Sequence, residues 1–259
     1  MTRPTFSTEL FNARVETQIQ AFFDAMANLY GRRGWRVEKP RREDSRWRNE
    51  DFTVEVTERY NDGACKRIRF TMRNLPGSTQ RPTSLTSQNA ISYEHTFSFD
   101  LPREYPQDLG AIRPTAETPL YHPRLSSSGT GRACYSVRGE LDRILEDLPF
   151  FVLLKPDRVA PPSQFQSDHG LNTAAMAWYE HDIDNIITTL DRLWEDRHRV
   201  SARRETRAAE ECPTGRVRIL TPSPSPRPTT TRPSRGRETT PPGQSRHVRI
   251  LDDEDADRT

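Results

Sequence analysis

The sequence of 259 residues contains few cysteines and no long apolar run. Its three cysteines, Cys65, Cys134 and Cys212, are widely spaced and form no CxxC pair, so the sequence indicates neither a zinc site nor a disulfide framework. A reducing, cytoplasmic compartment is therefore expected. No segment approaches about 18 consecutive apolar residues, and the N-terminus lacks the apolar stretch of a signal peptide, so we predict no membrane span and no membrane partner.

Lysine is scarce as well: Lys39, Lys66 and Lys155 are the only lysines among 39 basic residues. The abundant arginines are typical of GC-rich genomes and favour a bacterial source, and the scarce lysines leave few primary amines on the chain. Because 37 acidic residues nearly balance the basic ones, the formal net charge is only +2. Nucleic acid is therefore not predicted as a partner.

Apolar residues make up 32% of the sequence, which is low for a chain that is globular throughout. Residues 1–200 carry helix and strand periodicity and are predicted to form one domain. Pro, Ser, Thr and Arg dominate residues 201–259, which we predict to be a disordered tail. The tail holds two near-repeats, RVRIL at 216–220 and HVRIL at 247–251. Either each adds a strand to a partner's sheet or the similarity is a coincidence in a biased sequence.

Hydrophobic periodicity predicts the order of elements in the first 200 residues. A helix, a strand meander, a long irregular loop and further helices form an α+β arrangement, with helices packed on one side of an antiparallel sheet. Ser7 or Thr8 is expected to cap the first helix, and Gly31 with Gly34 to end it. The predicted helices cover residues 8–30, 139–154 and 171–196, the strands lie within 51–60, 66–74 and 92–102, and the loops cover 74–89 and 102–131.

The irregular loop and the segments around it carry five short motifs. They are Phe97-Ser98-Phe99-Asp100-Leu101-Pro102 with Tyr105-Pro106, Tyr121-His122-Pro123, Cys134 twelve residues after His122, Leu153-Leu154 with Pro156-Asp157, and Leu171-Asn172 with Ala174-Ala175. In this order they resemble the signature of the ubiquitin-conjugating-enzyme (UBC-like) family. That signature comprises F-x-F-x-x-P-x-x-Y-P, a His-Pro-Asn motif, the catalytic cysteine and an L-L-x-x-P-N…P-L-N-x-x-A segment.

The resemblance covers about residues 8–198 and implies a UBC-like fold with a four-stranded antiparallel meander and a long active-site loop. Two departures stand out. Arg124 occupies the place of the family's asparagine, and the tryptophan that usually follows the cysteine is missing. These changes resemble those of divergent bacterial members that are found with ubiquitin-like proteins and activating enzymes, often in antiphage (antiviral) defence.

The resemblance implies a transferase in which the Cys134 thiolate accepts a ubiquitin-like C-terminus as a thioester and passes it to a target amine. The implied partners are a ubiquitin-like protein, an adenylating (activating) enzyme and a target protein. The domain needs no metal or organic cofactor for this chemistry. The alternative for Cys134 is a buried core cysteine, because cysteine packs as a small hydrophobe. The glycine-rich residues before it favour an exposed loop instead.

Four further residues are carried over as site candidates. His122 is expected to hold the loop by hydrogen bonds, and Arg124 either stabilises an oxyanion or faces solvent. Asp168 and His169 fall near the family's gate residue and could lower the pKa of the incoming amine or take its proton.

Two other functions compete with the enzyme. The first is a catalytically inactive UBC- or RWD-like protein-binding module, which the missing asparagine and tryptophan favour and the retained cysteine opposes. The second is an adaptor that works mainly through its tail.

Overall fold

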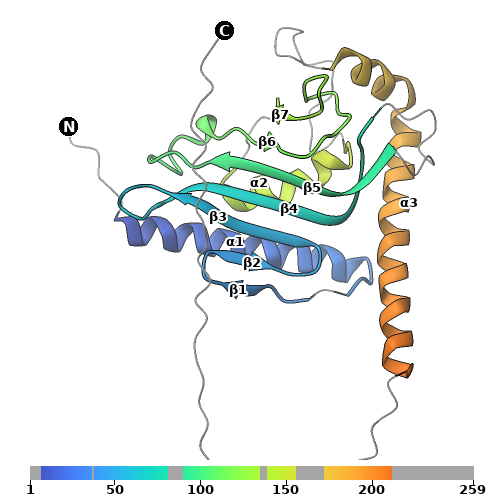
Figure 1. Cartoon of the computed structure of the whole chain (residues 1–259), viewed down its shortest axis with the longest axis horizontal. Coiled ribbons are helices and arrows are strands. Elements are labelled where there is room, and N and C mark those ends of the chain that lie inside the picture. Colours follow the sequence, from blue (N-terminus) through green and yellow to red (C-terminus); the bar gives the residue numbers. More distant parts are fainter. Residues whose placement is uncertain (1–6, 37, 81–89, 135–138, 156–171, 212–259) are drawn as a thin grey trace, which may run out of the picture. The chain divides into compact units, whose positions relative to one another are not determined.

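The computed structural model describes residues 7–36, 38–80, 90–134, 139–155 and 172–211, with side chains described as far as residue 200. It shows the predicted α+β arrangement of an N-terminal helix, an antiparallel sheet and C-terminal helices (Figure 1). The described residues all belong to one compact unit, and residues 212–259 lie outside them. The elements are α1 (Thr8–Arg32), β1 (Arg41–Glu43), β2 (Arg46–Arg48), β3 (Phe52–Arg59), β4 (Cys65–Ser78), β5 (Ile91–Asp100), the 3-10 turn η2 (Leu109–Ala111), β6 (Thr115–Ala116), β7 (Gly131–Arg132), α2 (Leu141–Val152) and α3 (Thr173–Glu211).

Helix α1 begins at the predicted cap. The Ser7 hydroxyl accepts a hydrogen bond from the backbone N–H of Leu10 (3.2 Å), which satisfies one of the free donors at the helix start. The helix continues through Gly31 to Arg32, slightly beyond the predicted end. Gly34 follows in the left-handed region, with φ of +70°, and its N–H closes the last turn on the Gly31 carbonyl (3.0 Å).

The sheet is an antiparallel meander in which the seven strands β1 to β7 lie in sequence order. The predicted antiparallel meander is confirmed, but the expected number of four strands is wrong. Strands β1 and β2 have three residues each and β6 and β7 have two, which is too short for an alternating pattern to show in the sequence. The predicted loop at residues 74–89 is also wrong at its start, because β4 runs on to Ser78.

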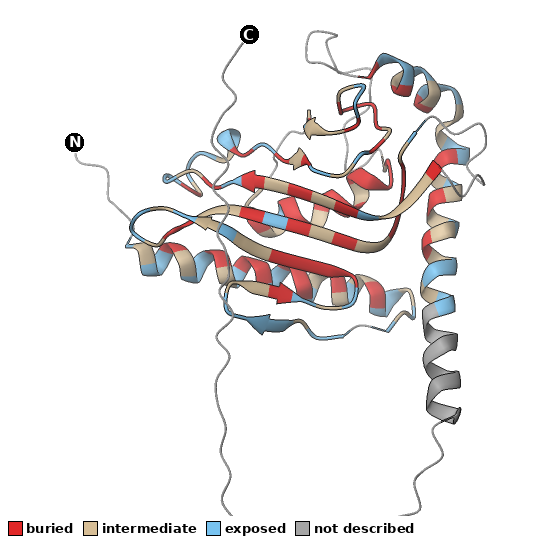
Figure 2. Ribbon diagram, in the orientation of Figure 1, coloured by how far each residue is buried: buried red, intermediate tan, exposed pale blue. Residues whose placement is uncertain are grey.

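The core lies between the sheet and the helices. Figure 2 shows buried residues alternating along the central strands and following the inner face of α1. Phe22 of α1 is fully buried and meets the rings of Phe52 and Phe70 edge-on, with centroids 5.3 and 5.2 Å apart. Aromatic pairs in this geometry add to the stabilisation from apolar burial. The apolar residues that recur at three- and four-residue steps along this helix therefore face the sheet, except Leu10, which is 63% exposed.

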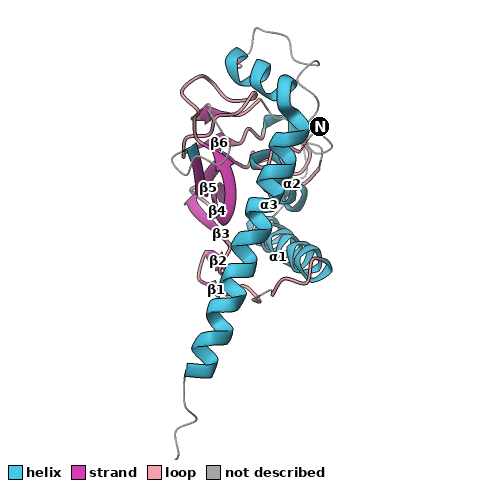
Figure 3. Ribbon diagram, turned by 90° about the vertical axis from the view of Figure 1, so that its right-hand side faces the viewer, coloured by secondary structure: helices cyan, strands magenta, loops and turns pink. Residues whose placement is uncertain are grey.

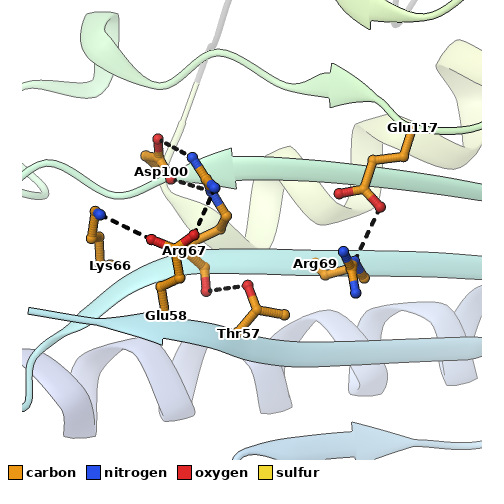
Figure 4. Close-up of polar contacts among 7 residues, drawn as sticks. All are labelled: Thr57, Glu58, Lys66, Arg67, Arg69, Asp100 and Glu117. Atoms are coloured by element: carbon orange, nitrogen blue, oxygen red, sulfur yellow. Dashed lines mark hydrogen bonds and ion pairs between the residues drawn. The ribbon is translucent and has the colours of Figure 1, made fainter. Parts of the chain in front are cut away.

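The helices pack on one side of the sheet, and in the described part of the chain no helix covers the opposite face (Figure 3). Alternate side chains of each strand point to that face, and on the central strands those side chains are mostly polar. Arg67 of β4 bonds both Glu58 of β3 and Asp100 of β5, and Arg69 pairs with Glu117 (Figure 4). These side chains are one third to one half exposed, so each ion pair adds little to stability.

Both predicted C-terminal helices are present. Helix α3 starts after Asn172, whose side-chain oxygen accepts the N–H of Ala175 (3.0 Å), and it continues to Glu211 with an irregular residue at Asp182. Its buried Trp194 packs against Tyr30 at the end of α1, with ring centroids 5.9 Å apart. None of the helices in the described residues is long and apolar enough to cross a membrane.

Candidate active site

Cys134 lies two residues after β7, which follows the loop 117–130 between β6 and β7. A hydrogen bond from the Leu120 N–H to the Gly129 carbonyl (2.9 Å) joins the two arms of this loop. Gly129 has φ of +73°, and a Cβ placed on it would lie 2.7 Å from the Leu120 carbonyl oxygen. Only glycine fits this position without a shift of the backbone, so residue type and loop geometry are matched here.

His122 holds the loop from inside. It is fully buried, and its ring stacks on Phe151 of α2 with centroids 3.8 Å apart. Its Nδ1 accepts the backbone N–H of Arg124 (3.0 Å), so the proton must reside on Nε2, which donates to the Phe151 carbonyl oxygen at 3.0 Å. Burial, aided by the positive charge of Arg124, lowers the pKa of His122 to about 3. The imidazole is therefore neutral at ordinary pH, and both of its nitrogens are engaged.

Arg124 is paired with Cys134 through the backbone. The N–H of Cys134 donates to the Arg124 carbonyl (2.9 Å), and the Arg124 guanidinium donates back to the Cys134 carbonyl oxygen (3.3 Å). Arg124 is only 3% exposed, so the expectation that it simply faces solvent is wrong. Instead, the buried side chain bonds a backbone carbonyl of the site. A buried positive charge therefore lies against the residue that carries the thiol.

The two described cysteines differ in access. Cys65 is buried at the start of β4, and burial raises the pKa of its thiol to about 12. Cys134 is partly exposed, so the alternative of a buried core cysteine does not describe it. A reactive thiol must be accessible to its electrophile and must ionise to the thiolate, and Cys65 meets neither condition. Cys134 is thus the reactive-site candidate of this pair, and Cys212 lies outside the described residues.

Asp168 and His169 belong to the segment 156–171, which lies outside the described residues. Residues 135–138, directly after Cys134, lie outside them as well. The assignment of Asp168 and His169 as gate residues stays a prediction. The described part of the site therefore brings together three of the five candidates: Cys134, His122 and Arg124.

One buried polar group of the domain was not singled out from the sequence. Gln18 lies on the apolar stripe of α1, between Val15 and Phe22, and is only 9% exposed. It bonds the Tyr105 hydroxyl and the Glu140 carboxylate. The available signal was a polar residue at a core position of an amphipathic helix, because such a group needs a buried partner.

In the described residues, no cluster of three or more His, Cys, Asp or Glu side chains is arranged to hold a metal ion. The arrangement offers a partly exposed cysteine, a neighbouring buried guanidinium and a neutral histidine whose ring nitrogens both bond the backbone. These groups suit acyl transfer through a thioester, in which a cysteine works without a strong base. Compared with known proteins, the sequence matches no protein-family model and no curated protein.

Proposed function

We propose that this chain is a ubiquitin-like protein conjugating enzyme of the UBC-like family that carries its cargo on Cys134. The observation that carries the proposal is the position of this accessible thiol. Cys134 follows a loop in which His122 bonds the Phe151 carbonyl of α2 and Arg124 bonds the Cys134 carbonyl. It stands at the place where the motifs put the family's catalytic cysteine. The order of helix, antiparallel meander, irregular loop and helices supports a UBC-like fold.

The proposed reaction is a double acyl transfer. The Cys134 thiolate attacks the C-terminal carbonyl of a ubiquitin-like protein held as a thioester on its activating enzyme. A new carbon–sulfur bond forms to Cys134, the carbon–sulfur bond to the activating enzyme breaks, and the cysteine of that enzyme leaves as the thiolate. A target amine then attacks the same carbonyl, the carbon–nitrogen bond forms, and Cys134 departs as the thiolate while the amine loses a proton.

The described residues support particular roles in these steps. His122 does not serve as the base, because both of its ring nitrogens are hydrogen-bonded and burial disfavours the protonated imidazolium that a base would become. The guanidinium of Arg124 is the cation beside Cys134, and we assign to it the stabilisation of negative charge that develops on the acyl oxygen. Removal of the amine's proton is left to solvent or to the predicted gate residues Asp168 and His169.

The proposed partners are the ubiquitin-like protein, its activating enzyme and a target protein, in a cytoplasmic bacterial pathway with a role in antiphage defence. The scarcity of lysine suits this function, because amines on the chain itself would compete for the thioester. Lys66 pairs with Glu58 at 2.9 Å, and Lys155 is largely buried against Asp191. The hydrogen bond to Glu58 raises the pKa of Lys66 and so favours its protonated, non-nucleophilic form.

One observation favours a second function. The Arg124 guanidinium bonds the backbone of Cys134 and so already has a structural task, and the family's asparagine is absent. On that view the chain is an inactive UBC- or RWD-like module that kept the fold and recruits proteins. The accessible thiol is the feature that this view leaves unexplained.

A charging assay separates the two functions. Wild type, Cys134→Ala and Cys134→Ser are incubated with the cognate ubiquitin-like protein, its activating enzyme and ATP, with Cys212→Ser as the matched cysteine control. We expect an adduct that dithiothreitol removes from wild type and Cys212→Ser, no adduct on Cys134→Ala, and a reductant-resistant ester on Cys134→Ser. A charged activating enzyme without transfer to Cys134 would leave only the binding module.

A further inference from the structure

Two consecutive residues of the loop 117–130, Tyr121 and His122, contact two different helices. The Tyr121 ring packs on Trp178 of α3, with centroids 5.5 Å apart and ring planes at 58°. The His122 ring stacks on Phe151 of α2, and its Nε2 donates to the Phe151 carbonyl oxygen at 3.0 Å. A third element takes part, because the Tyr121 N–H donates to the Ser78 carbonyl at the end of β4 (2.7 Å). The loop is thus held against α2, α3 and β4 over two residues.

The two helices are bonded to each other at the same place. Tyr179, the neighbour of Trp178, is 4% exposed, and its hydroxyl donates to the Leu154 carbonyl oxygen just after the end of α2 (3.0 Å). Leu154 follows Phe151 by three residues. Loop, α2 and α3 therefore form a closed circuit of contacts between described residues, and a shift of α3 against α2 would strain the loop.

Trp178 lies in the short first part of α3. The backbone is irregular at Asp182, with φ of −140° and ψ of 30°, and the helix bends there (Figure 1). The Trp178 side chain is partly buried and packs against the core. The first part of α3, 173–181, is therefore a helical segment of its own, placed beside the loop by Trp178 and Tyr179.

The circuit reaches Cys134 through hydrogen bonds. The Nδ1 of His122 accepts the Arg124 N–H at 3.0 Å, and the Arg124 carbonyl accepts the Cys134 N–H at 2.9 Å. The Arg124 guanidinium donates back to the Cys134 carbonyl oxygen. Each step from Trp178 to the backbone of Cys134 is thus a peptide bond, a ring contact or a hydrogen bond between described residues.

The part of Tyr121 that holds the loop is its ring. The hydroxyl oxygen is buried and bonds no described residue. A buried hydroxyl without a partner costs stability relative to an apolar group of the same shape. The contribution of Tyr121 therefore comes from its aromatic contact with Trp178 and from its backbone bond to Ser78.

We propose that Tyr121 and Trp178 are positioning residues, which place Cys134 for acyl transfer by fixing the loop 117–130 between α2 and the start of α3. The first part of α3 thereby governs how the site is assembled, although it contains none of the candidate site residues. The inference rests on the proposed function for its charging readout, whereas its hydrogen-exchange readout needs no partner protein.

The test uses Trp178→Ala in the full-length chain. This change leaves space beside Tyr121 into which the loop can shift. Amide hydrogen exchange of Arg124 and Cys134, followed by NMR, should accelerate about tenfold, the factor that corresponds to about 1.4 kcal/mol, because local opening of the loop releases these amides. Single-turnover charging at saturating activating enzyme should slow about tenfold, since small displacements of reacting groups are costly. The half-saturating concentration should stay unchanged.

The matched control is Trp35→Ala. Trp35 is also partly buried, and it stacks on His198 in another part of the fold, with centroids 4.2 Å apart. Its loss should weaken the fold without reaching the loop, so the Arg124 and Cys134 amides should exchange within about twofold of wild type, and charging should be equally unaffected.

Variants of Tyr121 test the same contact from the other side. Tyr121→Phe keeps the ring and should exchange like wild type, whereas Tyr121→Leu should exchange like Trp178→Ala. Tyr121→Leu also keeps the inference testable if Trp178→Ala does not fold, because leucine retains apolar bulk without the ring.

Three results would overturn the inference. They are unchanged exchange of the Arg124 and Cys134 amides in the folded Trp178 and Tyr121→Leu variants, equal acceleration in Trp35→Ala, and accelerated exchange with unchanged charging. If wild type forms no thioester while the two amides accelerate as expected, the proposed function fails and the positioning contact stands.

Discussion

Acidification should weaken the fold through His122, the residue that holds the loop before Cys134. Its imidazole is neutral in the folded protein because burial lowers its pKa from 6.5 to about 3. In the unfolded chain it titrates near 6.5, so below that pH the unfolded state binds a proton that the folded state does not. The stabilisation is complete above pH 6.5 and is lost as the pH falls toward 3.

The magnitude at pH 5 follows from this difference. That pH is about 1.5 units below the pKa of the unfolded imidazole, which is then mostly protonated, while the folded imidazole is still neutral. Protonation of the unfolded state therefore lowers the free energy of unfolding by about 2 kcal/mol relative to neutral pH. Urea unfolding of wild type and His122→Gln at pH 5, 6 and 7 measures this contribution. His95 and His198, whose pKa values are also lowered, titrate alike in both proteins and cancel in the comparison.

We expect wild type to be more stable than His122→Gln at pH 7, because the variant loses the fixed contacts to Arg124 and Phe151. That advantage should shrink by about 2 kcal/mol at pH 5. Parallel pH profiles for the two proteins would refute the reasoning, since they would mean that His122 is not buried as a neutral ring.

Three other changes have defined outcomes. Gly129→Ala should lower the free energy of unfolding by about 2–4 kcal/mol, since it adds a 2.7 Å clash to an unfavourable φ, whereas the control Gly63→Ala, which meets no described atom within 4 Å, should cost only about 1 kcal/mol in thermal unfolding. Burial raises the pKa of Asp51 to about 6, so the folded state holds its proton more tightly than the unfolded state. Asp51→Asn should therefore be more stable than wild type by up to about 3 kcal/mol at pH 7, with the gain vanishing toward pH 4, as urea unfolding would show. Arg124→Ala should slow thioester formation by about tenfold or more in single-turnover charging, and Arg124→Lys should restore only part of the rate, because the charge returns without the planar fork of donors.

The helices could be predicted because their apolar residues recur over many turns. Phe11, Val15, Phe22 and Met26 all face the core as the stripe indicated. The short strands at both ends of the sheet could not be predicted, since two or three residues carry no readable alternation. The stretch 41–48 reads as a charged run and forms β1 and β2 with a turn between them. Hydrophobic periodicity therefore predicted the long elements and missed the short ones.

The sequence could nominate site residues but could not give their contacts. Motif spacing selected Cys134 and His122 as candidates, whereas the bond from Arg124 to a carbonyl ten residues away arises only in the folded loop. Gln18 shows the same limit. Its polar side chain on an apolar stripe signalled a buried partner, but Tyr105 and Glu140 come from distant parts of the chain. Sequence pattern finds the residue that needs a partner, and the fold supplies the partner.

Intact-mass measurement after charging shows whether Cys134 carries a ubiquitin-like protein as a thioester. Full-length chain, ubiquitin-like protein, activating enzyme and ATP are mixed, and the mass is read before and after treatment with dithiothreitol. We expect a mass increase of one ubiquitin-like protein less one water, located on the peptide that contains Cys134 and lost on reduction. An unchanged mass beside a fully charged activating enzyme, or an adduct located on another residue, would contradict it.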